Sequence, residues 1–255
     1  MNYDAVFFDV DDTLFDHEHD RIPPEHMEAL GRLQAAGMKV CLASGRCLSL
    51  MEDLGVIDAF DWDGIVAGNG CFVYAENGKL IFEDPIPKES ADKVFEVCKE
   101  RGVPVFAGGN TDLVTIRDDP ATIHLFKAVH IRDVPEREPR DGDKFAVMSL
   151  LTDDQTKIEG LEFEGCRMLH NLWCSEFIRD TQTKLDGIHR LMDHFGLKTF
   201  LAFGDSVNDL EMLEGADMGV AMANSMPEVL EKISEHCGPV NEGGILPWLT
   251  DHHII

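Results

Sequence analysis

Positively charged residues are scarce in this chain of 255 residues. Lysine and arginine together number 22, against 48 aspartates and glutamates, which gives a formal net charge of −26. Nucleic acids and anionic membrane surfaces attract cationic proteins, so this charge argues against a sequence-independent binder of either. A site for an anionic small molecule would need local positive charge, because the overall field repels anions.

Several other features are missing from the sequence. No apolar stretch approaches the length of a membrane-spanning helix, and the first residues, MNYDAVFF, lack the basic segment and cleavage site of a secretory signal. The seven cysteines are an odd number and form no C-x-x-C pair. We therefore expect a cytoplasmic protein with mostly buried, reduced thiols and no membrane association.

Short apolar runs separated by helical patterns indicate the fold class. Unbroken apolar runs are typical of parallel strands buried on both faces. Such runs occupy residues 5–8, 40–43, 64–68, 199–204 and 218–222. Helical patterns lie between them. One opens at Pro23 and Pro24 and closes at Gly37, and another runs from Leu185 and closes at Gly196. This alternation predicts an α/β fold with a doubly wound, Rossmann-like parallel sheet.

The middle of the chain has a different pattern. Helix patterns (88–101, 120–130, 153–163) mix there with strand patterns (112–116, 144–152, 167–173, 176–180) and several prolines. A mixture of this kind is typical of an α+β unit rather than of alternating β-α-β units. We predict that residues 84–182 form a separate α+β domain, which is inserted into a sheet-forming domain made of residues 1–83 and 183–255.

Polar residues follow three of the predicted strands. They are the segments Asp9-Val10-Asp11-Asp12-Thr13, Ser44-Gly45-Arg46 and Gly204-Asp205-Ser206-Val207-Asn208-Asp209. Ligands of open α/β sheets bind outside the carboxyl ends of the strands, so we expect these segments to converge there. Clustered carboxylates suit a hard cation such as Mg²⁺, and Ser44 with backbone N–H groups and a nearby lysine suits a phosphate. One carboxylate facing that phosphate can act as a nucleophile, and a second can transfer protons.

Taken together, these motifs resemble the haloacid dehalogenase (HAD) superfamily. The match consists of D-x-D-x-T after an apolar strand, then A-S-G-R, then Lys184 at a helix start, then G-D-x-x-N-D-x-x-M. The GNG of residues 68–70 and the segments 212–229 and 241–245 are similar to the Cof-type branch, subclass IIB. The inserted residues lie where this branch carries its cap, so the resemblance implies that residues 84–182 govern substrate specificity.

The resemblance implies a role for each matched residue. Asp9 would be the nucleophile, forming an aspartyl-phosphate, and Asp11 the general acid and base. The implied Mg²⁺ ligands are Asp9, Asp205 and the backbone carbonyl of Asp11. The implied phosphate-binding groups are Ser44, Gly45, Lys184, Asn208 and the backbone of Val10, with Thr13 and Asp209 in support. Arg46 and Glu176 are candidate substrate contacts.

The implied activity is that of a Mg²⁺-dependent phosphatase acting on small phosphomonoesters, with sugar phosphates as the expected class. The expected partner is the small-molecule substrate, without nucleic acid or membrane, and the expected state is a monomer or weak dimer. A phosphomutase on the same scaffold is one alternative. A non-catalytic binding or regulatory protein is another, although the intact motif set argues against it.

The sequence departs from the family pattern at two positions. Asp12 stands where this branch usually has glycine, and we expect it to shape a turn rather than bind metal. Leu185 replaces a glycine often found after the lysine, which would at most narrow the floor of the site. Residues 17–20, His-Glu-His-Asp, are either a metal-binding tract or, as we favour, a solvated loop beside the site.

Other assignments stay open at this level. Residues 9–20 loosely match a calcium loop, but Leu14 and Asp20 stand where that loop has glycine and glutamate. Asp209 either orients the lysine or the water shell of the metal, or it is an ordinary acid in the first turn of a helix, stabilised by the helix dipole. Arg46 either reaches substrate or pairs with a surface acid. Further candidate substrate contacts in the middle domain are Asn110, His124, Trp173 and Arg179.

Overall fold

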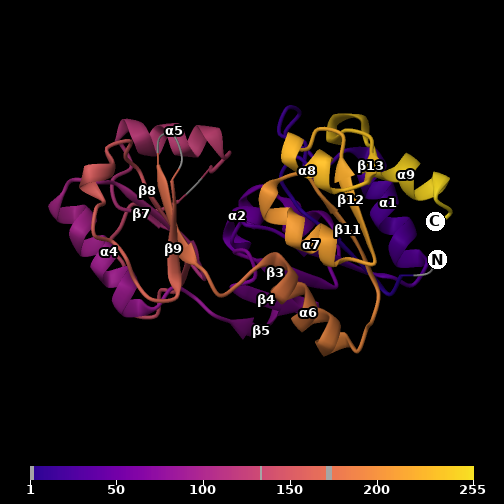
Figure 1. Cartoon of the computed structure of the whole chain (residues 1–255), viewed down its shortest axis with the longest axis horizontal. Helices are drawn as coiled ribbons and strands as arrows, with labels where there is room; N and C mark the ends of the chain where they lie inside the picture. Colours follow the sequence, from indigo (N-terminus) through magenta and orange to yellow (C-terminus); the bar gives the residue numbers. More distant parts are fainter. Residues whose placement is uncertain (1–2, 133, 171–173) are drawn as a thin grey trace. The chain divides into compact units, whose positions relative to one another are not determined.

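The computed structural model describes residues 3–132, 134–170 and 174–255. The chain divides into two compact units (Figure 1). The first unit contains the chain up to residue 45, residues 56–82 and residues 183–255, and the second contains residues 46–55 and 83–182. The short segment 46–55 therefore belongs with the middle part of the chain. The function of the second unit as a cap stays a prediction.

The first unit is built on an eight-stranded sheet with the order β13-β12-β11-β1-β2-β3-β4-β5. Its strands are β1 (Ala5–Phe8), β2 (Lys39–Ala43), β3 (Gly64–Ala67), β4 (Phe72–Ala75), β5 (Lys79–Glu83), β11 (Phe200–Gly204), β12 (Met218–Met222) and β13 (Glu235–Cys237). Strand β1 pairs in parallel with β11 on one side and β2 on the other, and parallel pairing continues to β13 and β3. The predicted α/β fold is therefore confirmed.

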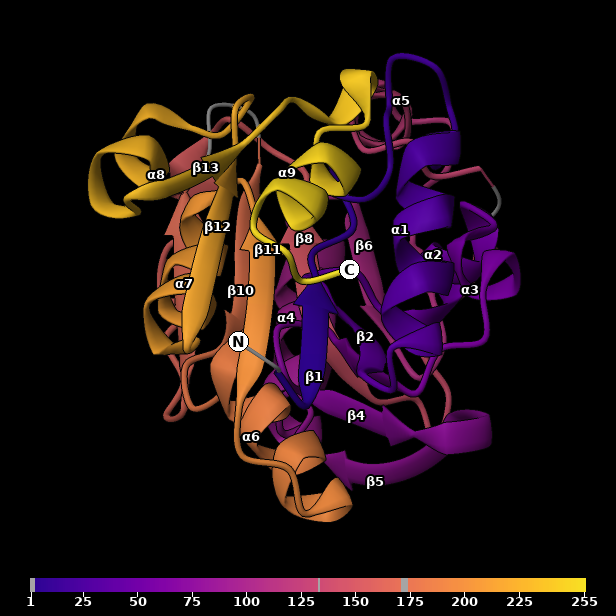
Figure 2. The same ribbon diagram turned by 90° about the vertical axis from the view of Figure 1, so that its right-hand side faces the viewer.

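Helices cover both faces of this sheet (Figure 2). They are α1 (Pro24–Ala35), α3 (Val56–Ala59), α6 (Lys184–Phe195), α7 (Leu210–Gly215), α8 (Pro227–Lys232) and α9 (Ile245–Asp251), with 3₁₀ turns η1 (Glu76–Gly78), η3 (Val207–Asp209) and η4 (Val240–Glu242). Phe7 and its register partner Ala202 pack in one cluster with Ile188 of α6. Phe8 and Phe203 stack on the opposite face, where Phe203 meets Trp248 of α9. Both faces are buried, which explains the unbroken apolar runs of these strands.

The start of α6 is fixed by its own sequence. The side chain of Thr183 accepts the N–H of Asp186, and the side chain of Asp186 accepts the N–H of Thr183, so the helix begins with a capping box. Gly196 ends the helix in the left-handed conformation, as its position after the apolar pattern predicts. Lys184 is thereby held in the first turn of α6.

Two glycines allow α6 to approach the turn that follows β3. A Cβ atom on Gly187 would lie 2.4 Å from Cγ1 of Val66, and one on Gly70 would lie 2.1 Å from the carbonyl oxygen of Thr183. Gly70 also has a positive φ of 92°, which glycine adopts without strain. The position of Lys184 therefore depends on the absence of side chains at both glycines.

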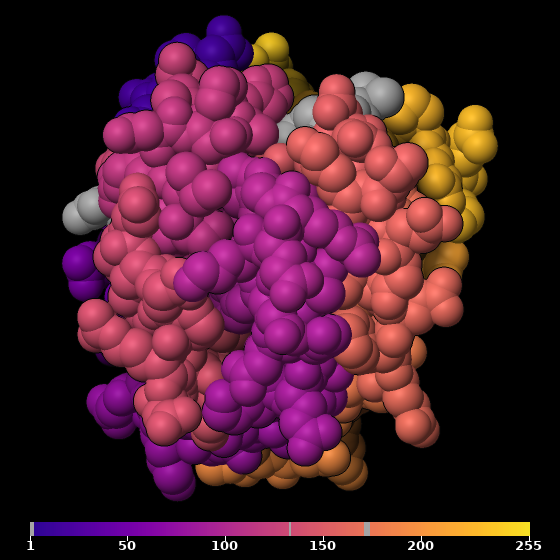
Figure 3. Space-filling view, turned by 90° about the vertical axis from the view of Figure 1, so that its left-hand side faces the viewer, coloured from indigo at the N-terminus to yellow at the C-terminus, as the bar shows by residue number. Residues whose placement is uncertain are grey.

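The second unit contains a five-stranded sheet with the order β7-β6-β8-β10-β9. Its elements are β6 (Val105–Gly109), β7 (Leu113–Val114), β8 (Phe145–Leu150), β9 (Cys166–His170), β10 (Ser175–Arg179), α2 (Leu48–Asp53), α4 (Lys88–Glu100), α5 (Pro120–Ala128) and η2 (Gln155–Lys157). Phe95 of α4 packs with Phe145 and Phe177 on one face of the sheet. The exposed side of α4, in purple, runs through the middle of Figure 3. Leu50 of α2 and Leu125 of α5 pack in a second cluster.

Most predicted elements of the middle segment are present, but the helix predicted for residues 153–163 is wrong. Only the 3₁₀ turn η2 forms there, and Gly160 has a positive φ of 84° that interrupts any helix. Trp173 and the end of the strand predicted for residues 167–173 lie outside the described residues. The seven cysteines all lie within the described ranges, and six of them are buried. Within the described ranges, no helix is long and apolar enough to span a membrane.

Asp84 connects the two chain segments at which the chain enters and leaves the second unit. Its carboxylate accepts hydrogen bonds from Arg179 at 2.9 and 3.1 Å, from Thr181 at 2.9 Å and from Gln182 at 2.8 Å. Although burial alone would raise the pKa of Asp84, the hydrogen bonds from these three side chains lower it. The ionised carboxylate therefore ties the start of the inserted segment to its end.

We predict that Asp84→Asn lowers the free energy of unfolding by about 1 kcal/mol at neutral pH. A carboxyl whose pKa is lowered by folding contributes its stability above its unfolded pKa and loses it as the pH falls through its folded pKa. Urea unfolding at pH 7 and below pH 4 should therefore show a difference from wild type that shrinks in acid. Asp141→Asn, at a fully exposed side chain, is the control; an equal difference at both pH values would contradict the prediction.

We also predict that Gly187→Ala lowers the free energy of unfolding by about 1–3 kcal/mol, because the added methyl group overlaps Val66. The matched control is Gly31→Ala in the interior of α1, where no atom lies within 4 Å of the added carbon. That change should raise stability by about 0.4–1 kcal/mol through reduced flexibility of the unfolded chain. Equal changes in the free energy of unfolding for both substitutions would contradict the prediction that the close approach of α6 to β3 makes Gly187 sensitive to an added methyl group.

Candidate functional site

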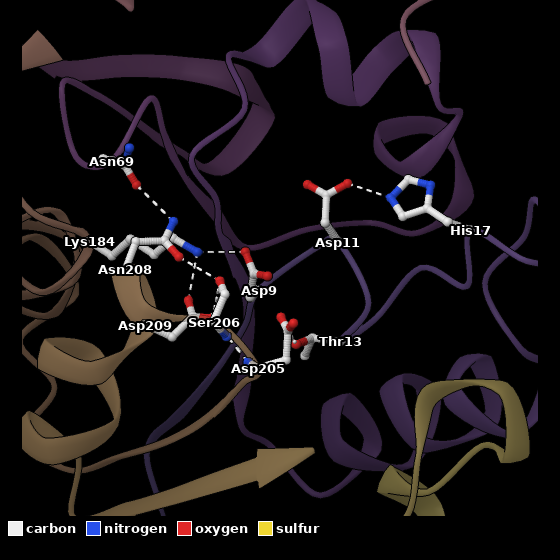
Figure 4. Close-up of polar contacts among 10 residues, drawn as sticks. All are labelled: Asp9, Asp11, Thr13, His17, Asn69, Lys184, Asp205, Ser206, Asn208 and Asp209. Atoms are coloured by element: carbon white, nitrogen blue, oxygen red, sulfur yellow. Dashed lines mark hydrogen bonds and ion pairs between the residues drawn. The ribbon is translucent and has the colours of Figure 1, made fainter. Parts of the chain in front are cut away.

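The carboxyl ends of three adjacent parallel strands carry the predicted site residues. Asp9 follows β1, Ser44 follows β2 and Asp205 follows β11, and these strands lie side by side in the sheet. All three residues are buried, with Asp9 only 4% exposed. Figure 4 shows Asp9, Asp205, Asp209 and Lys184 gathered at this edge. The convergence predicted from the topology is therefore present.

Lys184 joins two of the acidic side chains. Its Nζ lies 2.5 Å from Oδ1 of Asp9 and 2.6 Å from Oδ1 of Asp209, and its side chain is 1% exposed. Burial alone would lower the pKa of Lys184, but the charges of Asp209 and Asp9 raise it. The ammonium group is therefore charged and supplies the local positive charge that the acidic chain otherwise lacks.

Asp209 combines the two roles that the sequence left as alternatives. Its Oδ1 contacts Lys184, while its Oδ2 accepts the backbone N–H groups of Asp205 and Ser206 at 3.0 Å each. The second pair of bonds fixes the turn η3 that follows β11. Asp209 thus orients the lysine and caps the turn at once.

The cluster has more negative than positive charge. Ligand atoms of Asp9, Asp205 and Asp209 all lie within 4.8 Å of one another. Burial, together with the charge of Asp209, raises the pKa of Asp9 well above that of a free carboxyl and the pKa of Asp205 to about 7. When all three carboxyl groups are ionised, they exceed the single ammonium group by two negative charges, which one divalent cation would balance. This donor set of oxygens in a buried, acidic site fits Mg²⁺.

Asp205 is oriented by a neighbouring hydroxyl group. Oγ1 of Thr13 donates to Oδ1 of Asp205 at 3.1 Å, so the segment after β1 and the segment after β11 are joined directly. Thr13 is fully buried. The structure places Thr13 beside Asp205, and its supporting role in the site stays a prediction.

A second group of polar residues lies beside the lysine. The side chain of Asn208 donates to Oδ1 of Asn69 at 3.3 Å, and the N–H of Asn69 donates to the carbonyl of Ser44 at 3.0 Å. A Cβ atom on Gly45 would lie 3.3 Å from Asn69 and 3.4 Å from Asn208. The predicted phosphate-binding residues Ser44, Gly45 and Asn208 are therefore close together, and Asn69 joins them.

Sequence reasoning missed two members of this group. Asn69 lies in the GNG segment, which was noted only as a family feature, and its positive φ of 53° turns the chain toward Ser44. Ser206 donates from Oγ to the side-chain oxygen of Asn208 at 2.6 Å and so holds that amide in place. The signal for Asn69 was available, because asparagine at a turn tolerates positive φ and adds a polar side chain.

Asp11 has a different partner from Asp9. Its Oδ1 lies 2.6 Å from Nε2 of His17, and the His17 side chain is only 14% exposed. Figure 4 shows this pair apart from the lysine cluster. The favoured prediction of a solvated loop is therefore wrong for His17, because this side chain packs edge-to-face against Phe15. Ligand atoms of Asp16, Glu18 and His19 form a separate small cluster, which His17 does not join.

Three further residues near these segments have defined surroundings. Asp12 is exposed and has a positive φ of 54°, in agreement with the predicted turn. The carbonyl oxygen of Val10 accepts the N–H groups of Leu14 and Phe15. The backbone group of Val10 that we propose for phosphate binding is therefore its N–H. Leu185 packs against the apolar cluster, where a Cβ on Gly215 would meet its side chain. Leu185 thus fills space between α6 and α7, and the expectation that it has little consequence for the site stays a prediction.

The candidate substrate contacts Arg46 and Glu176 belong to the second unit. Arg46 donates from Nη2 to the carbonyl of Val129 at 2.7 Å. Glu176 lies on β10, and burial raises its pKa. Arg179 is engaged by Asp84, and Asn110 holds the turn at Gly142. Of the two remaining candidates, His124 is exposed on α5 and Trp173 lies outside the described residues.

Comparison with known proteins identifies relatives over nearly the whole chain. The family model of the haloacid dehalogenase-like hydrolases matches residues 6–249. The candidate phosphatase YkrA of Bacillus subtilis (strain 168) is 30% identical over 257 residues, covering 96% of each chain. The HMP-PP phosphatase of Cronobacter sakazakii is 26% identical over 267 residues, covering 96% of this chain and 95% of the relative.

Solved structures show the same architecture. A protein of Geobacillus kaustophilus (strain HTA426) matches with a TM-score of 0.90 and 24% identity, covering 100% of both chains. A HAD subclass IIB sugar phosphatase matches with a TM-score of 0.80 and 25% identity, covering 98% of this chain and 99% of that one. This likeness supports the Cof-type branch that the motifs predicted. With the family model matching nearly every residue that builds the sheet and the acidic cluster, the chain belongs to the haloacid dehalogenase-like hydrolases.

Proposed function

We propose that this protein is a Mg²⁺-dependent phosphatase that hydrolyses small phosphomonoesters through an aspartyl-phosphate on Asp9. The observation that supports it best is the Lys184 ammonium group held between Asp9 and Asp209 in a buried acidic cluster. Lys184 contacts Oδ1 of Asp9, which leaves Oδ2 to attack phosphorus. The same ammonium group would then balance charge on the transferring phosphoryl group.

The chemistry proceeds in two balanced steps. In the first, Oδ2 of Asp9 forms a bond to phosphorus as the ester oxygen leaves, and Asp11 donates a proton to that oxygen. In the second, Asp11 removes a proton from water, the water oxygen bonds to phosphorus, and the bond to Asp9 breaks. The products are an alcohol and inorganic phosphate, and both aspartates return to their starting states.

The residues proposed to hold the cation are Asp9, Asp205 and the carbonyl group of Asp11. When bound, Mg²⁺ would supply charge neutralisation for the phosphate and the acidic cluster. Ser44, the N–H of Gly45, Asn208 and Lys184 are proposed to hold the phosphate oxygens.

Sugar phosphates are the proposed substrate class. Support comes from the likeness to a structure described as a HAD subclass IIB sugar phosphatase. A screen of phosphate release across sugar phosphates, nucleotides and phosphorylated cofactors, with Mg²⁺ present, tests the class directly. Isomerised sugar phosphate without released phosphate would instead identify a phosphomutase.

We predict that Asp9→Asn lowers phosphate release by at least about a thousandfold, because an amide oxygen cannot replace the nucleophile. Circular dichroism should show an unchanged fold. Asp12→Asn is the matched control, since Asp12 is an exposed turn residue with positive φ, a conformation that asparagine tolerates. Substantial turnover in Asp9→Asn would rule out the covalent mechanism, and inactive wild-type protein across the whole screen would favour a non-catalytic role.

We further predict that Mg²⁺ raises the melting temperature and that EDTA reverses the rise and stops phosphate release. A cation at a hundredfold excess over its dissociation constant adds about 2.7 kcal/mol to stability, which corresponds to several degrees. Asp205→Asn should lose this thermal shift, while Asp12→Asn should retain it. An undiminished shift in Asp205→Asn would place the cation elsewhere.

A further inference from the structure

The loop after Thr13 holds one histidine in a fixed position against the predicted acid and base. Nε2 of His17 lies 2.6 Å from Oδ1 of Asp11, which is within hydrogen-bond distance. The His17 side chain is 14% exposed, whereas that of His19, two residues on, is 49% exposed. The contact is therefore made by a packed side chain and not by a freely mobile one.

Backbone hydrogen bonds on both sides of His17 hold it there. The carbonyl of Val10 accepts the N–H of Phe15 at 2.8 Å, so the chain returns to the segment that carries Asp11. On the other side, Asp16 and Arg21 exchange backbone hydrogen bonds of 2.8 and 3.2 Å. The ring of His17 also packs edge-to-face against Phe15, with centroids 5.1 Å apart. This arrangement leaves the imidazole little freedom to turn away from Asp11.

The two acids of D-x-D therefore have separate partners. Asp9 is bound by Lys184 and shares the cation cluster with Asp205 and Asp209, whereas the Asp11 carboxylate is directed to His17 (Figure 4). A carboxylate that binds a cation through its side chain is a poor proton donor, because the cation stabilises the ionised form. A partner that holds the Asp11 carboxylate apart from the cluster keeps it available for proton transfer.

We propose that His17 is a positioning residue that orients the Asp11 carboxyl group for proton transfer to and from the ester oxygen. The proposal rests on the function proposed above. In this assignment His17 acts through Asp11, its partner at 2.6 Å.

The test uses two esters that differ in their need for a proton donor. The alkoxide that leaves glucose 6-phosphate must be protonated, whereas the p-nitrophenolate that leaves p-nitrophenyl phosphate departs without a proton. Misplacing Asp11 in His17→Ala should therefore lower kcat/KM by about tenfold for the alkyl ester and by less than about threefold for the aryl ester. If another alkyl phosphate is turned over better in the screen, it replaces glucose 6-phosphate.

Three variants make this comparison specific. His17→Gln places an amide N–H near the position of Nε2 and should recover much of the loss on the alkyl ester. His19→Ala removes an imidazole from the same loop, where it pairs with Asp16, and should affect neither ester selectively. If His17→Ala does not fold, His17→Phe, which fills the space without a donor, replaces it.

The outcomes separate this proposal from the proposed function. Equal losses on both esters, or no loss on either, would overturn the role of His17 while wild-type turnover upheld the phosphatase. Failure of the wild-type protein to release phosphate from any ester would overturn the proposed function itself. A selective loss on the alkyl ester that His17→Gln recovers would support the positioning role.

Discussion

The contact of one buried ammonium group with two buried carboxylates is the interaction on which the rest of the site depends. Lys184 lies between Asp9 and Asp209, and removing it would leave acidic groups without compensation in a water-poor environment. Parallel pairing of β1 and β11 brings their carboxyl ends together, and this positive charge offsets the repulsion between the acidic groups gathered there. A chain with a net charge of −26 therefore concentrates positive charge at the one place where an anion is proposed to react.

The position of that ammonium group is set first by backbone features. The capping box at Thr183 fixes where α6 begins, and the absence of side chains at Gly70 and Gly187 allows the helix to touch the turn after β3. Asp209 adds a second constraint, since one of its oxygens holds the turn of η3 while the other holds the lysine. The local chain geometry and the electrostatics of the site are therefore linked. A methyl group added at Gly187 would displace α6 and with it the Lys184 ammonium group that compensates the acidic side chains.

Much of this arrangement could be predicted from the sequence, and the reasons differ between its parts. Apolar runs and helix caps depend on local chemistry, so the sheet and α6 were predictable, as was the convergence at the strand ends. The helix predicted for residues 153–163 failed because the left-handed Gly160 outweighed a periodic pattern. The burial of His17 depends on Phe15 and on backbone bonds to Val10, and spacing along the chain carries no information about such packing.

The packing of Leu185 against Gly215 limits which residues the chain can carry at these two positions. The leucine occupies the space that a side chain at position 215 would need, since a Cβ there would come within 2.7 Å of it. The two positions therefore constrain each other. A glycine at position 185 would leave room for a larger residue at position 215, whereas a larger residue at position 215 alone would press on Leu185 and on the helix that carries Lys184. Tolerance to substitution beside the reactive lysine is therefore decided partly by a residue of α7 that lies outside the reacting groups.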